Sequence, residues 1–303
     1  MKTLLLASTA LVATAGIAAA EFTVSGSAEI GIMGGDGVET QFFTDSEVTF
    51  SGSGETDGGL AFGASVQLDE PGAANPADDG GATYFLSYGG LRLDMGDTDG
   101  AYDAAMQEVA LAGGSIADDE TAHAGYNGNG GLDGTFDGQI ARATYTAAGF
   151  SAGLSVEVDD SGAADAVWGL GAAYSTDMGG TSITVGVGYQ TQEDTGNLVG
   201  VSAKVAMSSG LSLGINFSEF DPEGGADNIT HTAVGVGYSM NALSIGANYG
   251  VYAQDGADDI SGFGLAATYD LGGGLAAHLG YGNSDFGGGL ESDSFSLGLS
   301  MSF

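Results

Sequence analysis

The chain has 303 residues, of which 40 are Asp or Glu and 4 are Lys or Arg, so its formal net charge at pH 7 is −36. A surface of this sign repels nucleic acid and other anionic polymers and attracts cations, so a nucleic-acid partner is not expected. The sequence has no Cys, which excludes disulfide bonds and thiolate chemistry. A generally acidic, solubilising surface is an alternative origin of the charge excess, so the position of each carboxylate is more informative than the total.

The first twenty residues have the three parts of a secretory signal peptide. Met1-Lys2 supplies a positive start, an apolar stretch extends from residue 4 to residue 17, and Ala18-Ala19-Ala20 is a small-residue cleavage site. We therefore expect residues 1–20 to be removed after the chain crosses the inner membrane; a buried N-terminal helix is the alternative. No later stretch approaches ~18 consecutive apolar residues, so no transmembrane helix is predicted.

From residue 21 onward, most of the chain consists of strand-like segments with two different faces. In the last segment, Phe295, Leu297, Leu299, Met301 and Phe303 share one parity, while Ser and Gly occupy the other. Successive side chains of a strand point to opposite sides, so such a strand has one apolar face and one small polar face. Sixteen segments of this kind are predicted, starting near residues 22, 45, 60, 82, 91, 139, 150, 166, 181, 198, 211, 230, 242, 260, 275 and 293.

The length and number of these segments favour a membrane barrel over a soluble sandwich. Each segment is close to the ~9–11 residues that a tilted strand needs to cross a bilayer. In a membrane barrel the apolar face points outward to lipid and the polar face lines a lumen, and an even strand number closes the barrel with both termini on one side. The predicted fold is therefore all-β, a transmembrane antiparallel β-barrel of about sixteen strands over residues 21–303.

The predicted connections between strands alternate in length. Short turns are expected at 55–59, 89–90, 147–149, 177–180, 208–210, 241 and 271–274. Longer acidic loops are expected between them, for example at 69–81, 159–165, 221–229, 253–259 and 284–292. Short turns at one rim and long loops at the other are typical of outer-membrane barrels.

The Tyr residues of the strands mostly lie near strand ends and share the apolar parity. Amphipathic rings at a lipid–water boundary form such girdles, whereas Tyr in the core of a sandwich would need a buried partner for each hydroxyl. Trp168 has the same outward parity and is expected to anchor the barrel in lipid. The Tyr residues concerned are Tyr84, Tyr88, Tyr145, Tyr174, Tyr189, Tyr238, Tyr249, Tyr269 and Tyr281.

One predicted connection, residues 98–138, is far longer than the others. Loops of this length without regular structure are usually functional or disordered. This one is rich in carboxylates, contains no Lys or Arg, and has one candidate helix at 102–111. If it folds into the barrel as an inward third extracellular loop, it narrows the pore and makes the throat negative. The carboxylates predicted for this constriction are Asp97, Asp99, Asp103, Glu108, Asp118, Asp119 and Glu120.

Beyond residue 20 the sequence has three basic residues, Arg92, Arg142 and Lys204, each on the polar parity of its strand. A charge in the lumen is hydrated, whereas at mid-depth on the lipid face it would cost roughly 2–4 kcal/mol. Arg92 and Arg142 flank the long connection in sequence. We therefore predict that they face its carboxylates across the constriction and set a transverse field; the alternative is that both are solvated lumen residues.

Catalytic groupings are not readable from the sequence. No Ser, His and Asp residues form a recognisable set, and the three His, His123, His231 and His278, are scattered. His231 and His278 are interpreted as isolated strand residues, and none of the three has further metal ligands at a useful spacing. An outer-membrane enzyme is therefore not indicated.

Hard oxygen ligands are concentrated at the start of the long connection. Asp97, Asp99 and Asp103 form a candidate Ca²⁺ site, and the run Asp118-Asp119-Glu120 offers a second set of ligands. Neither matches the twelve-residue EF-hand pattern. A solvated acidic loop is the alternative interpretation.

Several short motifs occur in order along the chain. They are Glu21-Phe22-Thr23-Val24-Ser25-Gly26, Val48-Thr49-Phe50-Ser51-Gly52, Glu55-Thr56-Asp57-Gly58-Gly59-Leu60-Ala61-Phe62-Gly63 and Gly96-Asp97-Thr98-Asp99-Gly100-Ala101-Tyr102-Asp103. With the terminal Phe303, the sequence after residue 20 resembles the general porins of alphaproteobacteria such as Rhodobacter over its whole length. The resemblance implies a homotrimer of sixteen-stranded barrels, each with its third extracellular loop folded inward as an eyelet. It also implies that Phe303 is part of the signal read by the outer-membrane assembly machinery.

The sequence departs from this family in one respect. The throat of these porins usually opposes acidic loop residues with a cluster of several Arg, and this chain has too few basic residues for that. Plain cation preference is therefore expected rather than a strong transverse field.

The function predicted from the sequence is a passive, water-filled channel in the outer membrane, in contact with lipid and lipopolysaccharide. Ions and small hydrophilic solutes would diffuse through it with cations favoured, and no cofactor is required. Two alternatives remain: a substrate-selective outer-membrane channel, and a secreted acidic β-protein stabilised by Ca²⁺.

Overall fold

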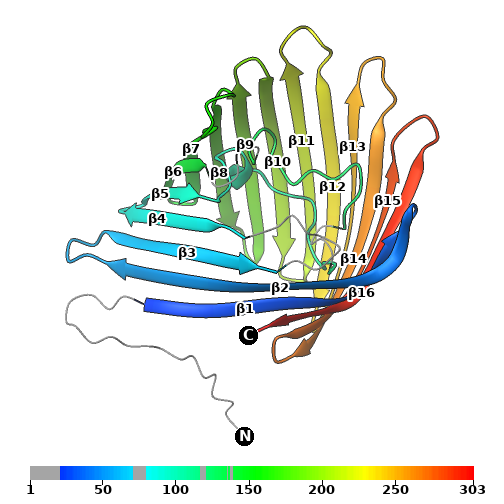
Figure 1. Cartoon of the computed structure of the whole chain (residues 1–303), viewed down its shortest axis with the longest axis horizontal. Helices are drawn as coiled ribbons and strands as arrows, with labels where there is room; N and C mark the ends of the chain where they lie inside the picture. Colours follow the sequence, from blue (N-terminus) through cyan, green and yellow to red (C-terminus); the bar gives the residue numbers. More distant parts are fainter. Residues whose placement is uncertain (1–20, 71–79, 117–120, 135, 137–138) are drawn as a thin grey trace, which may run out of the picture.

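The computed structural model describes residues 21–70, 80–116, 121–134, 136 and 139–303, and the expected signal peptide lies outside these residues. The described residues form sixteen strands in one closed sheet, each antiparallel to its neighbours in sequence (Figure 1). The predicted antiparallel barrel of about sixteen strands is therefore confirmed. The strands are β1 (Glu21–Gly35), β2 (Val38–Glu55), β3 (Ala61–Asp69), β4 (Ala82–Tyr88), β5 (Leu91–Gly96), β6 (Ile140–Ala147), β7 (Phe150–Glu157), β8 (Val167–Asp177), β9 (Thr181–Gln192), β10 (Gly196–Met207), β11 (Leu211–Pro222), β12 (Ile229–Met240), β13 (Leu243–Gln254), β14 (Ile260–Gly272), β15 (Leu275–Asp285) and β16 (Glu291–Ser302).

The first and last strands close the barrel. β1 and β16 pair with Ile30 opposite Leu299. The backbone of Phe303 exchanges two hydrogen bonds with that of Gly26, at 2.8 and 2.9 Å. Closure satisfies the backbone groups that an open sheet edge would leave unpaired, as a lipid environment requires.

Apolar side chains cover the outside of the barrel. Leu170, Val201 and Leu279, all in the middle of their strands, are 52%, 52% and 50% exposed. Polar side chains of the opposite parity, such as Ser202 and Asn216, are buried inside. This pattern inverts that of a water-soluble domain and places the apolar face in hydrocarbon.

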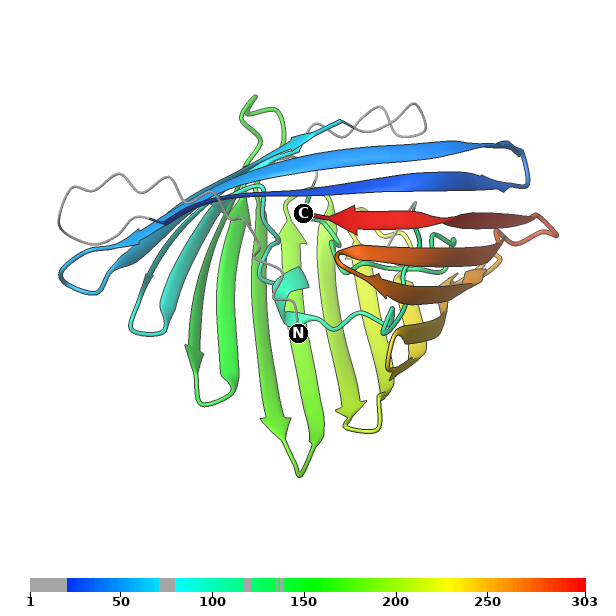
Figure 2. The same ribbon diagram turned by 90° about the horizontal axis from the view of Figure 1, so that it is seen from below.

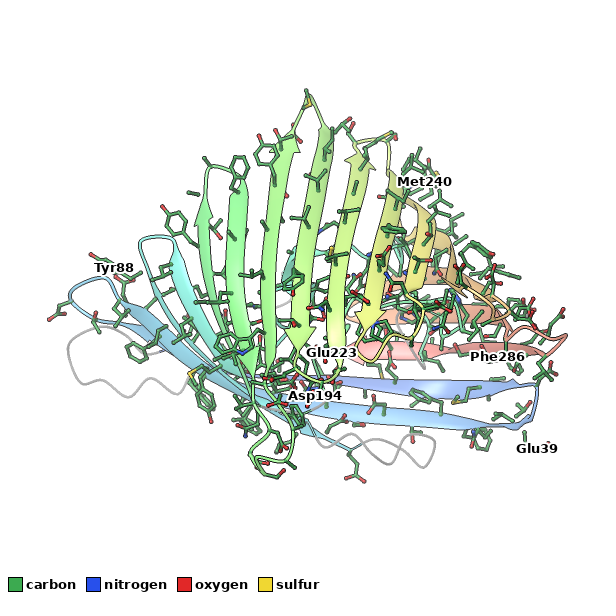
Figure 3. All side chains as sticks on the ribbon, turned by 90° about the horizontal axis from the view of Figure 1, so that it is seen from above. Glu39, Tyr88, Asp194, Glu223, Met240 and Phe286 are labelled. Carbon is green, nitrogen blue, oxygen red and sulfur yellow. The ribbon has the colours of Figure 1, made fainter. Side chains whose placement is uncertain are left out.

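The two rims of the barrel differ in their connections. Tyr88 and Met240 mark one rim in Figure 3, and Asp194, Glu223 and Phe286 mark the other. At the first rim the connections are the short turns 56–60, 89–90, 148–149, 178–180, 208–210, 241–242 and 273–274. The second rim bears the longer loops, but the turns at 36–37 and 193–195 there are also tight, so the alternation in length is less regular than predicted.

The predicted start of the second strand, near residue 45, is too late. β2 begins at Val38, directly after a turn in which Gly37 has a φ of +76°. The segment at its start includes the adjacent pair Phe42-Phe43, which breaks the alternation of apolar and polar residues. It is nonetheless a strand because it pairs with β1 as far as Gly35 opposite Val38.

The prediction of a helix at 102–111 is also wrong beyond the first turn. The structure has a single 3-10 turn, Asp103–Ala105, and the backbone becomes extended at Met106, where ψ is 153°. The next amide, of Gln107, donates to the Ser202 hydroxyl of β10 at 2.8 Å. The helix ends because the barrel wall accepts the hydrogen bond that a further helical turn would form internally.

No helix in the described part of the chain has the length and apolar character needed to cross a membrane.

Candidate pore site

The connection between β5 and β6, residues 97–139, is here called L3. Its described residues lie against the inner wall of the barrel (Figure 2). Its outgoing arm is held by backbone amides that donate to side chains of the wall. The amides of Ala101 and Gln107 each donate at 2.8 Å, to Ser155 of β7 and Ser202 of β10 respectively. Further along, the Gly114 amide donates at 2.9 Å to Thr268 of β14.

The returning arm of L3 is held in the same way. The Ala124 amide donates to Ser284 of β15 at 2.9 Å. The Leu132 amide donates to Gln190 of β9 at 2.8 Å. At the end of the arm, the amides of Gly134 and Phe136 donate to the two carboxylate oxygens of Glu157, at 3.1 and 2.8 Å. Glu157, at the end of β7, is fully buried.

Three His residues add side-chain anchors to L3. His231 of β12 donates from Nε2 to the Gly125 carbonyl at 3.0 Å, and His278 of β15 lies 3.1 Å from the Gly114 carbonyl through Nδ1. His123, within L3, bonds through Nε2 to the Asn248 side chain of β13. His231 and His278 lie in strands, as predicted, but neither is isolated, because both contact the loop.

Glycine on the lumen face makes this close approach possible. A Cβ at Gly235 would overlap the carbonyl of Val109, and one at Gly171 would overlap the carbonyl of Ala101. A side chain at these positions would push L3 off the wall. The wall glycines at which an added Cβ would lie closer than 3.4 Å to an atom of L3 are Gly31, Gly171, Gly186, Gly188, Gly200, Gly214, Gly235, Gly237, Gly246, Gly250, Gly262, Gly264, Gly280, Gly282 and Gly298.

A small hydrophobic core also fixes L3 inside the barrel. Tyr102 and Met106 of the outgoing arm are buried against Leu198 of β10, and Phe220 of β11 packs against this cluster. This core lies on the lumen side of the wall. L3 is thus held by apolar packing as well as by hydrogen bonds.

The carboxylates at the start of L3 lie close enough to influence one another. Burial raises the pKa of Asp103 to about 7, with further contributions from the charges of Asp99, Glu108 and Asp133, while Arg142 lowers it. Asp103 therefore changes its charge near neutral pH.

Asp133, on the returning arm, has a related environment. Burial raises its pKa to about 6, the Glu157 charge adds to this, and a hydrogen bond to Gln190 opposes it. Its Oδ2 atom is buried without a hydrogen-bond partner among the described residues and lies against the backbone of Gly100. Asp103 and Asp133 of L3 thus both change their charge near pH 6 to 7.

The two Arg residues predicted for the constriction share one carboxylate. Arg92 of β5 forms an ion pair with Asp94 at 2.7 Å, and Arg142 of β6 lies 3.6 Å from the other oxygen of Asp94. Arg142 also donates to the Asp99 carbonyl at 2.9 Å, which ties it to the start of L3. Asp94, which sequence reasoning missed, compensates part of this positive charge.

The remaining predicted site residues are more dispersed. Asp97 follows β5 and is exposed, next to Gly81. Glu108 accepts a hydrogen bond from the Tyr126 hydroxyl at 3.0 Å, which joins the two arms of L3. The run 118–120, with the predicted carboxylates Asp118, Asp119 and Glu120, lies outside the described residues.

The candidate Ca²⁺ ligands Asp97, Asp99 and Asp103 do not form a cluster. Within the part of the chain that the structure describes, no group of three or more His, Asp or Glu side chains is arranged to hold a metal ion. Ca²⁺ binding stays a prediction.

Further carboxylates line the opposite wall. Glu29 of β1 lies opposite Asp45 of β2, and Glu47 of β2 lies opposite Asp69 of β3. Residues opposite each other in an antiparallel pair point to the same side, which here is the lumen. The hydroxyl of Ser27 donates to Glu47 at 2.9 Å. The alternation of polar and apolar residues in these strands is the signal that indicates these carboxylates, whereas the carboxylates predicted for the constriction all belong to L3.

Comparison with known proteins identifies the family. The family model described as Gram-negative porin matches residues 7–289. The chain belongs to the Gram-negative porin family. Its barrel is therefore an outer-membrane channel, and both family and fold are those of a channel and not of an enzyme.

Two curated relatives and two solved structures agree with this assignment. The porin of Rhodobacter capsulatus is 29% identical over 88% of this chain and 95% of its own length, and the porin of Fuscovulum blasticum is 25% identical over 74% and 79%. A refined porin structure superposes with a TM-score of 0.70 at 24% identity, and a mutant of Rh. blastica porin with 0.69 at 20%. Each match covers 93% of this chain and all of the solved one, and shows the fold alone.

Proposed function

We propose that the channel passes ions and small hydrophilic solutes by passive diffusion and that it prefers cations. The observation that carries this proposal is the distribution of lumen charge. Asp99, Asp103 and Glu108 lie on L3, and the wall of β1–β3 adds four further carboxylates. Arg92 and Arg142 are partly neutralised by Asp94, so the net lumen charge is negative. A ring of carboxylates raises the local concentration of cations and lowers that of anions.

The path for solutes lies between L3 and the opposite wall. The hydrogen bonds of L3 reach strands from β6 to β16, and Ile116 contacts Gly298 of β16 and Gly31 of β1. The wall from β2 to β5 thus faces the inner surface of L3 across the lumen. We infer that Asp103 and Glu108 on one side, and the carboxylates of β1–β3 on the other, line the constriction.

Liposome swelling tests passive diffusion. Vesicles that contain the purified protein should swell in isotonic pentose or hexose at a rate that decreases smoothly with solute size and does not saturate with concentration. Saturation for one sugar class would favour the alternative of a substrate-selective channel. The outward apolar face argues against the other alternative, a secreted β-protein. Solubility of the purified protein without detergent would favour that alternative.

We further propose a homotrimer in contact with outer-membrane lipid and lipopolysaccharide. β4 and β5 have 7 and 6 residues, whereas a tilted strand needs ~9–11 to cross the bilayer. These strands are too short to match the bilayer, so we infer that this side of the barrel contacts another subunit and not lipid. Light scattering of the detergent-extracted protein should give three times the chain mass.

Phe303 and the alternating strand before it are proposed to be read by the barrel-assembly machinery. The backbone pairing of Phe303 with Gly26 leaves its ring 77% exposed. Phe303→Ser should reduce the amount of folded, heat-modifiable protein in the outer membrane. Unchanged assembly would contradict this proposal.

Ca²⁺ at Asp97, Asp99 and Asp103 is a separate proposal, and passive flow does not require it. It is tested by adding EDTA during thermal unfolding. A lower unfolding midpoint that Ca²⁺ alone restores would support it, and an unchanged midpoint would exclude a structural ion.

A further inference from the structure

An apolar cleft interrupts the polar lining of the lumen on the side of the longer loops. It has a volume of about 450 Å³ and lies between the wall of β10–β14 and the returning arm of L3 at Asn127 and Leu132. Small-molecule sites commonly have volumes of about 300–1,000 Å³. The cleft is therefore large enough for a small organic solute.

The cleft owes its apolar wall to a row of paired residues that face the lumen. Leu198, Phe220 and Ile229 are opposite one another across β10, β11 and β12, and Tyr252 and Ile260 are opposite one another across β13 and β14. Ile260 is 38% exposed. The lumen parity elsewhere in these strands carries small or polar residues, so the row of large apolar side chains is a local exception.

His231 lines the cleft and has an unsatisfied, buried acceptor. Its Nε2 donates to the Gly125 carbonyl at 3.0 Å, so the neutral ring has its lone pair on Nδ1. His231 is 2% exposed, and Nδ1 has no hydrogen-bond partner among the described residues. Its ring lies 4.4 Å from the ring of Tyr252, centroid to centroid. A buried acceptor of this kind favours a ligand that brings a donor.

Two hydrogen bonds connect the cleft to a carboxylate, which bears on the charge of the ligand. The Tyr252 hydroxyl donates to the Tyr126 carbonyl at 3.4 Å, and the Tyr126 hydroxyl donates to Glu108 at 3.0 Å. Aromatic faces such as those of Tyr252 and Phe220 also attract cations. The electrostatics of this side of the lumen therefore favour a positive group beside the apolar cleft.

We propose that the cleft is a binding site for small aromatic cations, the class of aryl-alkyl ammonium ions, above the throat. The aromatic ring would pack against Phe220 and Ile260, and the ammonium group would lie toward His231 and the Tyr126–Glu108 pair. This inference rests on the proposed function, because it gives the cation-preferring pore a preferred solute class. Such a site would concentrate these solutes at the throat and saturate at high concentration.

The test is equilibrium binding to the protein in lipid nanodiscs, which contain no free detergent to fill the cleft. Phenethylammonium chloride is titrated by saturation-transfer NMR beside n-butylammonium, which lacks the ring, and phenylacetate, which reverses the charge. We expect phenethylammonium to bind at least about fivefold tighter than n-butylammonium, since partial burial of a ring is worth on the order of 1 kcal/mol, or about fivefold. It should also bind more tightly than phenylacetate, because the negative charge of phenylacetate is repelled by the carboxylates of the lumen. Equal binding of all three, or tighter binding of phenylacetate, would overturn the proposal.

Two variants locate the site. Phe220→Ser and Ile260→Ser should each weaken phenethylammonium binding about three- to fivefold. Phe85→Ser is the matched control, because Phe85 faces the lumen on β4 beneath Arg92, with 4.2 Å between Arg92 Cζ and the ring, on another part of the wall. If Phe220→Ser does not fold, Ile260→Ser still tests the site. Ile260 lies at the exposed end of its strand, so this variant should fold. Unchanged binding in folded Ile260→Ser would refute the assignment.

The binding assay also separates this inference from the proposed function. Selective binding in a barrel that does not conduct would contradict the channel and leave the cleft assignment intact. If the barrel conducts but phenethylammonium and n-butylammonium bind with equal affinity, the channel function stands and the cleft is not the proposed binding site.

Discussion

Asp103→Asn should remove part of the pH dependence of ion selectivity. Burial raises the pKa of Asp103 to about 7, so the carboxyl is neutral below this pH and gains its charge as the pH rises. For a pKa near 7, about 1% of the groups are ionised at pH 5 and about 90% at pH 8. Cation preference should therefore increase from pH 5 to pH 8, and the Asn variant, which stays neutral, should lose the part of the rise centred near pH 7.

The size of the effect follows from Coulomb's law. A unit charge about 5 Å from the path of an ion changes its energy by about 0.8 kcal/mol in water, and screening at ~0.1 M salt reduces this to about 0.5 kcal/mol. The sign reverses between K⁺ and Cl⁻, so their permeability ratio should change by about 1 kcal/mol, or about fivefold.

The assay is the reversal potential of channels in a planar bilayer under a KCl gradient, measured from pH 5 to pH 8. Asp159→Asn is the matched control, because hydrogen bonds from Ser161 and from the amides of Ala164 and Ala163 lower the pKa of that loop carboxyl to about 2, and its charge is constant over this range. A pH profile that is the same in Asp103→Asn and in the unmodified protein would refute the placement of Asp103 at the throat.

Four further results are expected. Asp103→Asn should also raise the thermal unfolding midpoint at pH 8 but not at pH 4, because the stability that a carboxyl of raised pKa contributes is fully present below its unfolded pKa and is lost as the pH rises through about 7. Arg142→Gln should shift the inflection of the selectivity profile to higher pH, since Arg142 lowers the pKa of both Asp103 and Asp133; an unchanged inflection would place Arg142 too far away to act. Gly235→Ala should lower the unfolding midpoint by several degrees and increase protease cleavage within L3, because the added Cβ overlaps the Val109 carbonyl, while Gly153→Ala, whose Cβ would have its nearest neighbour at 3.4 Å, should change neither. Replacing Asp118, Asp119 and Glu120 with Asn, Asn and Gln should lower cation preference, and unchanged selectivity would exclude them from the throat.

The strands were the part of the fold most visible in the sequence. Alternation of apolar and polar residues is a local property, and it located most strand starts within a residue or two. It failed at β2, where the adjacent Phe42 and Phe43 mask the pattern and the pairing with β1 decides. The helical segment is limited to one turn, Asp103–Ala105, for a similar reason. The amide of Gln107 donates to Ser202, a residue far away in sequence, so local sequence does not show where the helix ends.

The candidate site was predictable in composition but not in its supporting contacts. The carboxylates of L3 and the lumen parity of Arg92 and Arg142 could be read from local sequence. Asp94, which pairs with both, and Glu157, which accepts two amides of the loop, depend on tertiary placement.

One signal for the path of L3 was nevertheless present in the sequence. On the lumen parity of the later strands, glycine alternates with single polar residues, as in Gly214-Ile215-Asn216 and Gly246-Ala247-Asn248. Small residues that leave room for a backbone, next to side chains that can hydrogen bond to it, indicate a chain segment packed against the wall. The alternation was interpreted only as a small polar face.

We propose that the lumen is an open, negatively charged path. The decisive measurement records single channels of the purified protein in a planar bilayer under a KCl gradient at pH 8. We expect stepwise conductance with a reversal potential on the cation side, and a smaller reversal potential when Asp103 and Glu108 are changed to Asn and Gln. A reversal potential on the anion side, or no conductance from folded, heat-modifiable protein, would contradict it.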